Sequence, residues 1–373
     1  MDLSAYAIDG IAPARAERPL TSEDVARIIS AAHAARQAIV LHGGGTRIAI
    51  GEAPSRYDVA VDFRDLRGIV EHSAPDLVCS VRAGTTLSEL ATALAPARQR
   101  WPVDVADPER ATVGGTIASA APSPSRLRYQ HPRDWIIGCE AVLGDGTRTR
   151  AGGRVVKNVT GYDLTRLYSG SYGTLVAITE VSLKLVATDA IQQIYRLGVD
   201  ANDLARVALA LRAFPFEAIV VVSGRAPAIY VRASGAEAVA ARATAELGRH
   251  GAYEEVTAAE WQALIARTIR EEDVARCAVP YGREVDVLQG DGLAYVGAGI
   301  AYALGRRTTD ELAALRGRCE AMRGALVLER VPLETKRALG VWGTHGTSQR
   351  VGLSLKQRFD PRDVLAPGRL PLA

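Results

Sequence analysis

Hydrophobic and polar residues follow two different periods in the first part of the chain. The stretch TSEDVARIISAAHAARQ begins with a Thr cap and two acids and then repeats apolar residues at helical spacing, which predicts a helix over 22–36. The apolar run AIVLH behind it and the alternating YDVAVDF further on predict two strands. Together these segments indicate a β-α-β arrangement.

The pattern stays readable up to residue 187. LVCSVRAG (77–84) predicts a strand and TLSELATAL (86–94) a helix, whereas the Pro-rich segment 96–108 predicts no regular element. WIIGCEAVLGDGTRTRAG reads as a hairpin, because Asp-Gly is a common turn pair. A helix in DLTRLYSGSYG and a strand in TLVAITEVSLKLV complete this part.

Beyond residue 187 the pattern changes. Residues 190–330 alternate helices such as NDLARVALALRAF with strands such as AIVVVSG, which predicts a separate α+β domain. The tail QRFDPRDVLAPGRL is rich in Pro and basic residues, and we expect it to be a loop.

The composition excludes several classes of protein. A chain of 373 residues with 48% hydrophobic and 23% charged residues is typical of a soluble protein of two or three domains. The net charge of +3, without a Lys/Arg stripe, does not favour nucleic-acid binding. Four distant cysteines indicate neither a zinc site nor an iron–sulfur cluster held by this chain, so we expect no metal. The N-terminal MDLSAYAIDG does not read as a secretory signal and no apolar run is long enough to cross a bilayer, so we expect a cytoplasmic protein.

Two glycine-rich segments are candidate binding sites. HGGGTRIAIG (42–51) directly follows a predicted strand, and ATVGGTIASAA (111–121) places a glycine pair before a run of small residues. Consecutive glycines can form a concave nest of backbone N–H groups that holds an anion, although a simple turn explains the same letters. The chain contains neither the P-loop motif nor a Rossmann G-x-G-x-x-G after a strand.

The order of the motifs is more specific than any one of them. HGGGTRIAIG, VRAGTTLSELATAL, ATVGGTIASA, RDWIIGCEAVLGDG, KNVTGYDLTRLYSGSYGTLVAITEVSLKL and FDPRDVLAPGRL together resemble FAD-binding flavoproteins of the vanillyl-alcohol oxidase (PCMH) type. Within that family the chain is most similar to the FAD-binding accessory subunits of bacterial glycolate oxidases. The resemblance implies an α+β, PCMH-type two-subdomain FAD-binding fold with an α+β cap domain. It places the FAD-binding domain at 1–187 (subdomains of about 1–70 and 71–187), the cap at 188–335 and a returning C-terminal segment at 336–373.

The resemblance also implies the cofactor site, with backbone amides of both glycine segments holding the diphosphate. Its residues would be Gly43, Gly44, Gly45, Thr46, Arg47, Pro108, Thr112, Gly114, Gly115, Ala118, Gly173, Ile178 and Arg369. Some relatives attach the flavin through a histidine where this chain has Thr46, so we expect non-covalent FAD. We expect His42 to be part of the packing rather than a flavin ligand.

Catalytic residues are harder to assign. Oxidation of a 2-hydroxy acid needs a base for the hydroxyl proton, and relatives supply histidines after the middle domain, where this chain has only His345. The weak candidates are Tyr162 and His345. Lys157, Asn158, Asp163 and Arg166 lie near Tyr162 and could contact flavin or substrate, or could form a helix cap and an ion pair. Ala366 stands where the family usually has an Asn.

The resemblance therefore implies the FAD-binding subunit of a glycolate oxidase-type complex that oxidises a small 2-hydroxy acid. Its partners would be a catalytic flavoprotein subunit and an iron–sulfur subunit, which could hold it at the inner membrane. Two alternatives stay open: a stand-alone FAD-dependent D-2-hydroxy acid dehydrogenase, and a non-catalytic structural subunit.

Overall fold

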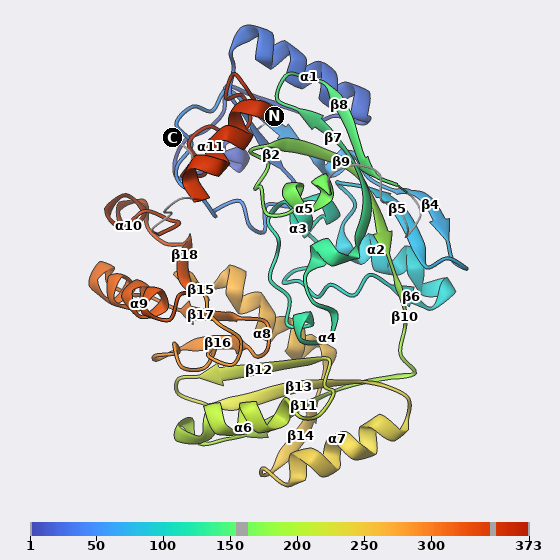
Figure 1. The fold of residues 1–373 in the computed structure, drawn as a ribbon, viewed down its shortest axis with the longest axis vertical. Coiled ribbons are helices and arrows are strands. Elements are labelled where there is room, and N and C mark those ends of the chain that lie inside the picture. Colours follow the sequence, from blue (N-terminus) through green and yellow to red (C-terminus); the bar gives the residue numbers. More distant parts are fainter. Residues whose placement is uncertain (1, 154–162, 344–347, 372–373) are drawn as a thin grey trace.

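The computed structural model of the chain describes residues 2–153, 163–343 and 348–371. It has two halves, each built around its own β-structure (Figure 1). No helix within these ranges is long and apolar enough to cross a membrane. The α+β class predicted from the pattern is confirmed.

The upper half in Figure 1 contains a small parallel sheet and a larger antiparallel sheet. The parallel sheet has the order β1 (Arg15–Glu17), β3 (Val59–Asp62), β2 (Ile39–His42). The antiparallel sheet has the order β4 (Ile69–Ser73), β5 (Val78–Arg82), β9 (Val176–Lys184), β7 (Ile136–Leu143), β8 (Arg148–Gly152). Among the described residues, the α-helices of this half are α1 (Ser22–Ala35), α2 (Leu87–Leu94), α3 (Val113–Ala118), α5 (Leu164–Tyr168) and α11 (Ser348–Phe359), whereas α4 (Arg126–Tyr129) packs against the lower half.

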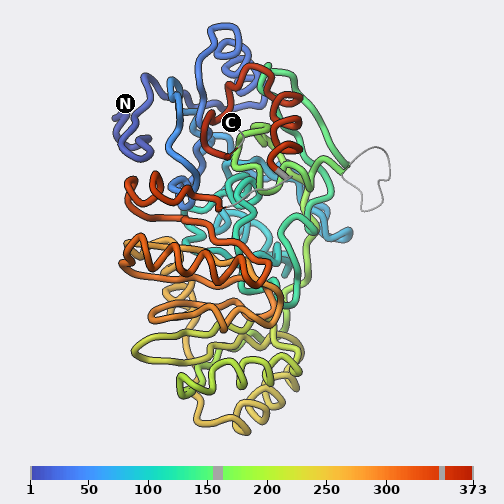
Figure 2. The backbone as a smooth tube through the Cα atoms, turned by 60° about the vertical axis from the view of Figure 1, so that its left-hand side comes forward, coloured from blue at the N-terminus to red at the C-terminus, as the bar shows by residue number. Residues whose placement is uncertain are grey.

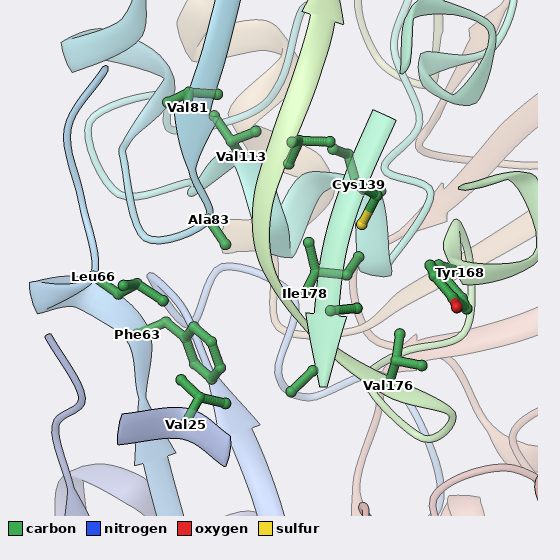
Figure 3. Close-up of a cluster of buried hydrophobic side chains, with 14 of the residues drawn as sticks. Val25, Phe63, Leu66, Val81, Ala83, Val113, Cys139, Tyr168, Val176 and Ile178 are labelled. Atoms are coloured by element: carbon green, nitrogen blue, oxygen red, sulfur yellow. The ribbon is translucent and has the colours of Figure 1, made fainter. Parts of the chain in front are cut away.

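Helix α1 shows how the local sequence sets this half. Thr21 and Asp24 form a capping box, which satisfies backbone N–H groups that the first turn would leave unpaired. The apolar positions of the helix are buried and pack toward β7 and β9. Figure 3 shows Val25 of α1 in the same apolar cluster as Val113 of α3 and Ile178 of β9. This shared core keeps the strand ends and α3 in fixed positions.

The lower half is an eight-stranded antiparallel sheet with helices on both faces. Its order is β14 (Tyr253–Val256), β11 (Ile191–Gly198), β13 (Ala228–Gly235), β12 (Ala218–Ser223), β16 (Gly292–Tyr295), β17 (Ile300–Leu304), β15 (Val274–Ala278), β18 (Ala325–Arg330). One face packs on α6 (Leu204–Leu211), α7 (Ala238–Gly248) and α9 (Thr309–Ala321), and the other on α8 (Ala258–Arg270). The short strands β6 (Gln99–Arg100) and β10 (Val186–Ala187) form an antiparallel pair, and β10 directly precedes β11, the first strand of this sheet along the chain.

The C-terminal part returns to the upper half, where Figure 2 shows it beside the N-terminal part. After α10 (Leu333–Leu339), Val364 and Ala366 exchange backbone hydrogen bonds with Ile39, which adds the tail to the edge of β2. One prediction is wrong here, because 357–359 form the last turn of α11 rather than a loop. The helix ends before Pro361, which cannot donate a backbone hydrogen bond.

Candidate functional site

A cavity opens in the upper half between the end of β2, α3 and the start of β9. Most of its walls come from glycines, small residues and apolar side chains. The residues around it are Val40, Leu41, His42, Gly43, Gly44, Gly45, Thr46, Arg47, Ile48, Ile50, Phe63, Ala83, Thr112, Gly114, Gly115, Ala118, Ser119, Tyr172, Gly173, Val176, Ile178 and Arg369. Every predicted cofactor residue except Pro108 is among them.

The glycine loop, residues 43–47, offers unpaired backbone donors to this cavity. Among the described residues, the amides of Gly44, Gly45, Thr46 and Arg47 donate to no acceptor, although all four residues are partly buried. Backbone N–H groups that are withdrawn from water usually have a partner. Successive free amides in a turn form the concave kind of site that binds anions.

Glycines are required in this loop for a second reason, which is contact with the other glycine segment. A Cβ on Gly44 would lie 1.6 Å from the carbonyl oxygen of Arg110, and one on Gly43 would lie 2.4 Å from Oγ1 of Thr112. Gly45 has φ +73°, a conformation that residues with a side chain rarely adopt. The loop therefore both turns the chain and packs bare backbone against segment 110–112.

The second glycine segment differs from the prediction. Val113 donates to the carbonyl of Thr85, Gly114 donates to that of Ala83, and Gly115 donates to the capping hydroxyl of Thr112. These three amides already donate to acceptors within the protein, so they are not available to a diphosphate. A Cβ on Gly114 would lie 2.7 Å from Cβ of Ala83, so this glycine serves close packing of α3.

The opposite wall of the cavity comes from the turn before β9. The amide of Tyr172 donates to the carbonyl of Ala118, which ties this turn to the end of α3. Gly173 has φ +69° and lies over Leu41, where a Cβ would be 3.2 Å from Cδ1. Ile178 follows on β9 and adds an apolar surface.

Two arginines give the cavity positive charge. Arg369, 5% exposed, lines the wall, and its guanidinium donates to the carbonyls of Ile48, Ile50 and Glu52. Burial lowers the pKa of Arg369 to about 10, which leaves it charged at neutral pH. Arg47 was predicted as a phosphate ligand, but its Nη2 forms a 2.6 Å ion pair with Glu329 of β18. Two donors of Arg47 have no partner among the described residues, its backbone amide and its buried Nε.

His42 ends β2 immediately before the glycine loop. Its Nε2 lies 2.5 Å from the hydroxyl of Tyr57, which itself donates to the carbonyl of Tyr6. Burial lowers the pKa of His42 to about 4, so the ring is neutral at pH 7. His42 borders the cavity, and its ring is engaged in aromatic packing, as expected from the sequence.

The remaining candidates fall outside the cavity or outside the described residues. Pro108 does not line the cavity, and its carbonyl accepts the amide of Ser88. Asp163 caps α5 and forms an ion pair with Arg166. These two residues therefore have the helix-cap and ion-pair role that the sequence analysis set beside contact with flavin or substrate. The other four, Lys157, Asn158, Tyr162 and His345, lie outside the described residues.

Several residues of the site were not predicted from the sequence. Tyr172, Ser119 and Phe63 border the cavity, and Arg110 donates through Nη2 to the carbonyl of Gly44. Glu329 is another, because it holds the side chain of Arg47 from the other half of the molecule. No local pattern signals such contacts, since they join distant parts of the chain.

Comparisons with known proteins identify the class of the domain. Residues 13–152 match the model of a family described as "FAD binding domain", so the chain carries an FAD-binding domain. A solved structure of alkyldihydroxyacetonephosphate synthase shares the fold, with a TM-score of 0.71 over 96% of this chain and 77% of that chain at 17% identity. The predicted PCMH-type fold is confirmed.

Three curated relatives are similar in part of their length. Glycolate oxidase subunit GlcE of Escherichia coli is 37% identical over 149 residues, which are 40% of this chain and 42% of the relative. Glycolate oxidase subunit GlcD of Bacillus subtilis is 33% identical over 45% of this chain and 36% of the relative. D-lactate dehydrogenase of Archaeoglobus fulgidus is 33% identical over 47% of this chain and 40% of the relative. The matched region thus spans less than half of each relative.

Proposed function

We propose that the cavity binds FAD with the diphosphate against the glycine loop. The observation that carries the proposal is the row of four free amides at Gly44–Arg47, because a diphosphate offers the negative charge and acceptor oxygens that such a nest binds. The buried cation of Arg369 on the same cavity wall fits an anionic cofactor as well. The match of residues 13–152 to an FAD binding domain supports the choice of ligand.

The residues around the cavity would divide the binding between them. The four amides would orient the diphosphate, and Arg369 would add positive charge without moving, since it is already held by three carbonyls. Gly173 and Ala118 leave room for the flat parts of the cofactor, and Ile178 covers them with apolar surface. FAD, when bound, supplies an acceptor for a hydride. Thr46 offers no imidazole for a covalent link, so we propose that the cofactor dissociates.

We further propose that the chain is the FAD-binding subunit of a glycolate oxidase or dehydrogenase-type complex. The complex would oxidise a small 2-hydroxy acid to the 2-oxo acid, removing a hydride and the hydroxyl proton, with electrons leaving through flavin to an iron–sulfur partner. Relatives named as glycolate oxidase subunits support this assignment. Residues 1–187 with 336–373 would hold FAD and 188–335 would form the cap. We propose a cytoplasmic location, with any membrane attachment made through the partners.

The surroundings of the cavity favour turnover in a partner subunit. Its described lining residues include no carboxylate, and the one histidine among them, His42, is engaged with Tyr57. A group that removes a hydroxyl proton must reach the substrate with a free acceptor atom. We therefore assign oxidation of the hydroxy acid to a separate catalytic flavoprotein subunit.

Absorbance spectroscopy tests the proposal. The purified chain should be yellow or become so with added FAD, acid precipitation should release the flavin, and glycolate or D-lactate alone should not bleach it. Bleaching by hydroxy acid should require the partner subunits. A folded chain that takes up no FAD would overturn the cofactor assignment, whereas rapid bleaching without partners would favour the stand-alone dehydrogenase.

A further inference from the structure

The turn that continues the glycine loop is held by two buried cations. Nη1 of Arg369 donates to the carbonyl of Glu52 at 3.0 Å, and its Nη2 donates to those of Ile48 and Ile50. Nζ of Lys336 donates to the intervening carbonyls of Ala49 at 2.8 Å and Gly51 at 3.3 Å. Five successive carbonyl oxygens, residues 48–52, therefore point alternately at one cation and the other.

Both cations are almost completely withdrawn from water. Lys336 is 2% exposed and Arg369 5%. The ammonium of Lys336 is balanced by the carboxylate of Asp9, with both oxygens within 2.9 Å. Burying an ion is unfavourable unless its hydrogen bonds are satisfied, and here backbone carbonyls satisfy most of them. A rearranged turn 48–52 would leave these buried ions without partners.

Both cations come from the part of the chain that returns to the upper half. Lys336 lies on α10, and Arg369 lies in the tail beyond α11. Further contacts join the same segments: the amide of Val341 donates to the carboxylate of Glu52, and the amide of Glu52 donates to the carbonyl of Arg369. Lys336 itself does not line the cavity.

We propose that Lys336 is a positioning residue for the cofactor site, and that with Arg369 it forms a clamp that fixes the glycine loop in its anion-binding shape. The inference rests on the proposed binding of FAD. The glycine loop precedes the clamped turn without a break, and its amides are useful only if they already converge. The coupling is reciprocal, so a ligand on the loop also tightens the hold of the turn on α10 and the tail.

The first test compares Lys336→Met with Arg316→Met. Arg316 is a matched control, because its guanidinium also donates to two carbonyls at the end of α10, those of Leu339 and Gly340, and not to the carbonyls of 48–52 among the described residues. We expect Lys336→Met to weaken FAD binding about 10–100-fold, the size found when supporting contacts of a ligand site are removed. Arg316→Met should change FAD affinity less than threefold. Equal losses in both variants, or a loss below threefold in Lys336→Met, would overturn the clamp.

A rescue experiment separates the missing cation from general damage. Lys336→Ala leaves space in which a small alkylammonium ion fits, so ethylammonium chloride should restore FAD affinity several-fold, and sodium chloride at the same concentration should not. Equal responses to the two salts would count against the proposed role of the charge.

Hydrogen exchange tests the clamp without relying on FAD. In the FAD-free protein, Lys336→Met should speed amide exchange in residues 43–52 at least tenfold relative to Arg316→Met. If the wild-type chain does not bind FAD, the proposed function fails while this comparison still decides the clamp. In a chain that binds FAD, the cofactor should slow exchange in 333–341 and 364–369 of the wild type but not of Lys336→Met. Unchanged exchange of 43–52 in Lys336→Met would refute the mechanical part of the proposal.

Discussion

The two glycine-rich segments look alike in the sequence but do different physical work. In the loop at 43–47 the glycines bring backbone close to Arg110 and Thr112 and leave four amides free toward the cavity. In the segment at 112–118 the amides of 113–115 are bonded to Thr85, Ala83 and the capping hydroxyl of Thr112, and Gly114 serves packing. A glycine run thus indicates that backbone segments approach closely. Whether a ligand can bind there depends on whether the backbone amides already donate to acceptors in the protein.

The largest expected effect comes from the first segment. Gly44→Ala places a methyl group 1.6 Å from the carbonyl oxygen of Arg110, so the loop must move and its amides no longer converge. We expect FAD retention to fall at least 100-fold, a loss of about 3 kcal/mol or more. The ratio of flavin to protein absorbance measures retention, and circular dichroism checks that the protein is folded. Full flavin content in this variant would show that the loop does not hold the cofactor.

The residue that precedes the loop gives a pH dependence. The pKa of buried His42 is lowered to about 4 from an ordinary 6.5, so between these values the unfolded chain takes up a proton that the folded one does not. Stability is therefore full above pH 6.5 and falls as the pH drops toward 4, by about 3 kcal/mol from this residue.

His42→Gln isolates this contribution, because glutamine can donate to Tyr57 and does not titrate. Denaturant unfolding of wild type and variant at pH 7, 5.5 and 4 measures it. As the pH falls from 7 to 4, the free energy of unfolding of the wild type should decrease by about 3 kcal/mol more than that of the variant. Parallel curves over this range would mean that His42 is solvated or charged in the folded state.

A smaller effect is expected in the second segment. Gly114→Ala brings a methyl group 2.7 Å from Cβ of Ala83, which forces α3 away from segment 83–85. Overpacking of this kind costs about 1–3 kcal/mol. Thermal unfolding of the FAD-free protein should show the loss, and FAD affinity should fall much less than in Gly44→Ala. Equal losses of affinity in the two variants would remove the distinction between the segments.

The smallest effect is a gain, at a glycine with neither role. Gly317 is exposed within α9, and a Cβ built on it meets nothing within 4 Å. Gly317→Ala should stabilise the protein by about 0.5–1 kcal/mol, because alanine is the better helix former. The unfolding midpoint in urea measures the gain, and FAD affinity should be unchanged. A destabilised variant would indicate a contact of α9 that the fold does not explain.

The sequence predicted those helices and strands whose signals lie within one continuous stretch of the chain. Helix α1 carries its cap and its apolar stripe within one stretch, and the hairpin of β7 and β8 carries its turn pair. Strand β4 was missed, because three of its five side chains are exposed and show no alternation. The predicted cofactor residues came from family motifs and all but Pro108 line the cavity, whereas Tyr172, Ser119 and Phe63, the partner of Arg47 and the role of Lys336 were not predicted. The contacts of Arg47 and Lys336 cross 282 and more residues, which no local period reports.

The edge of β2 has a consequence for biosynthesis. Ile39 is paired with Val364 and Ala366, so the outer edge of β2, the strand that leads into the glycine loop, has no backbone partner until the ribosome has made the tail. The eight-stranded half, which is synthesised in between, can assemble first. Cofactor binding would then be the last step of maturation. A chain released before the tail was made would have a folded eight-stranded half but an incomplete cofactor cavity.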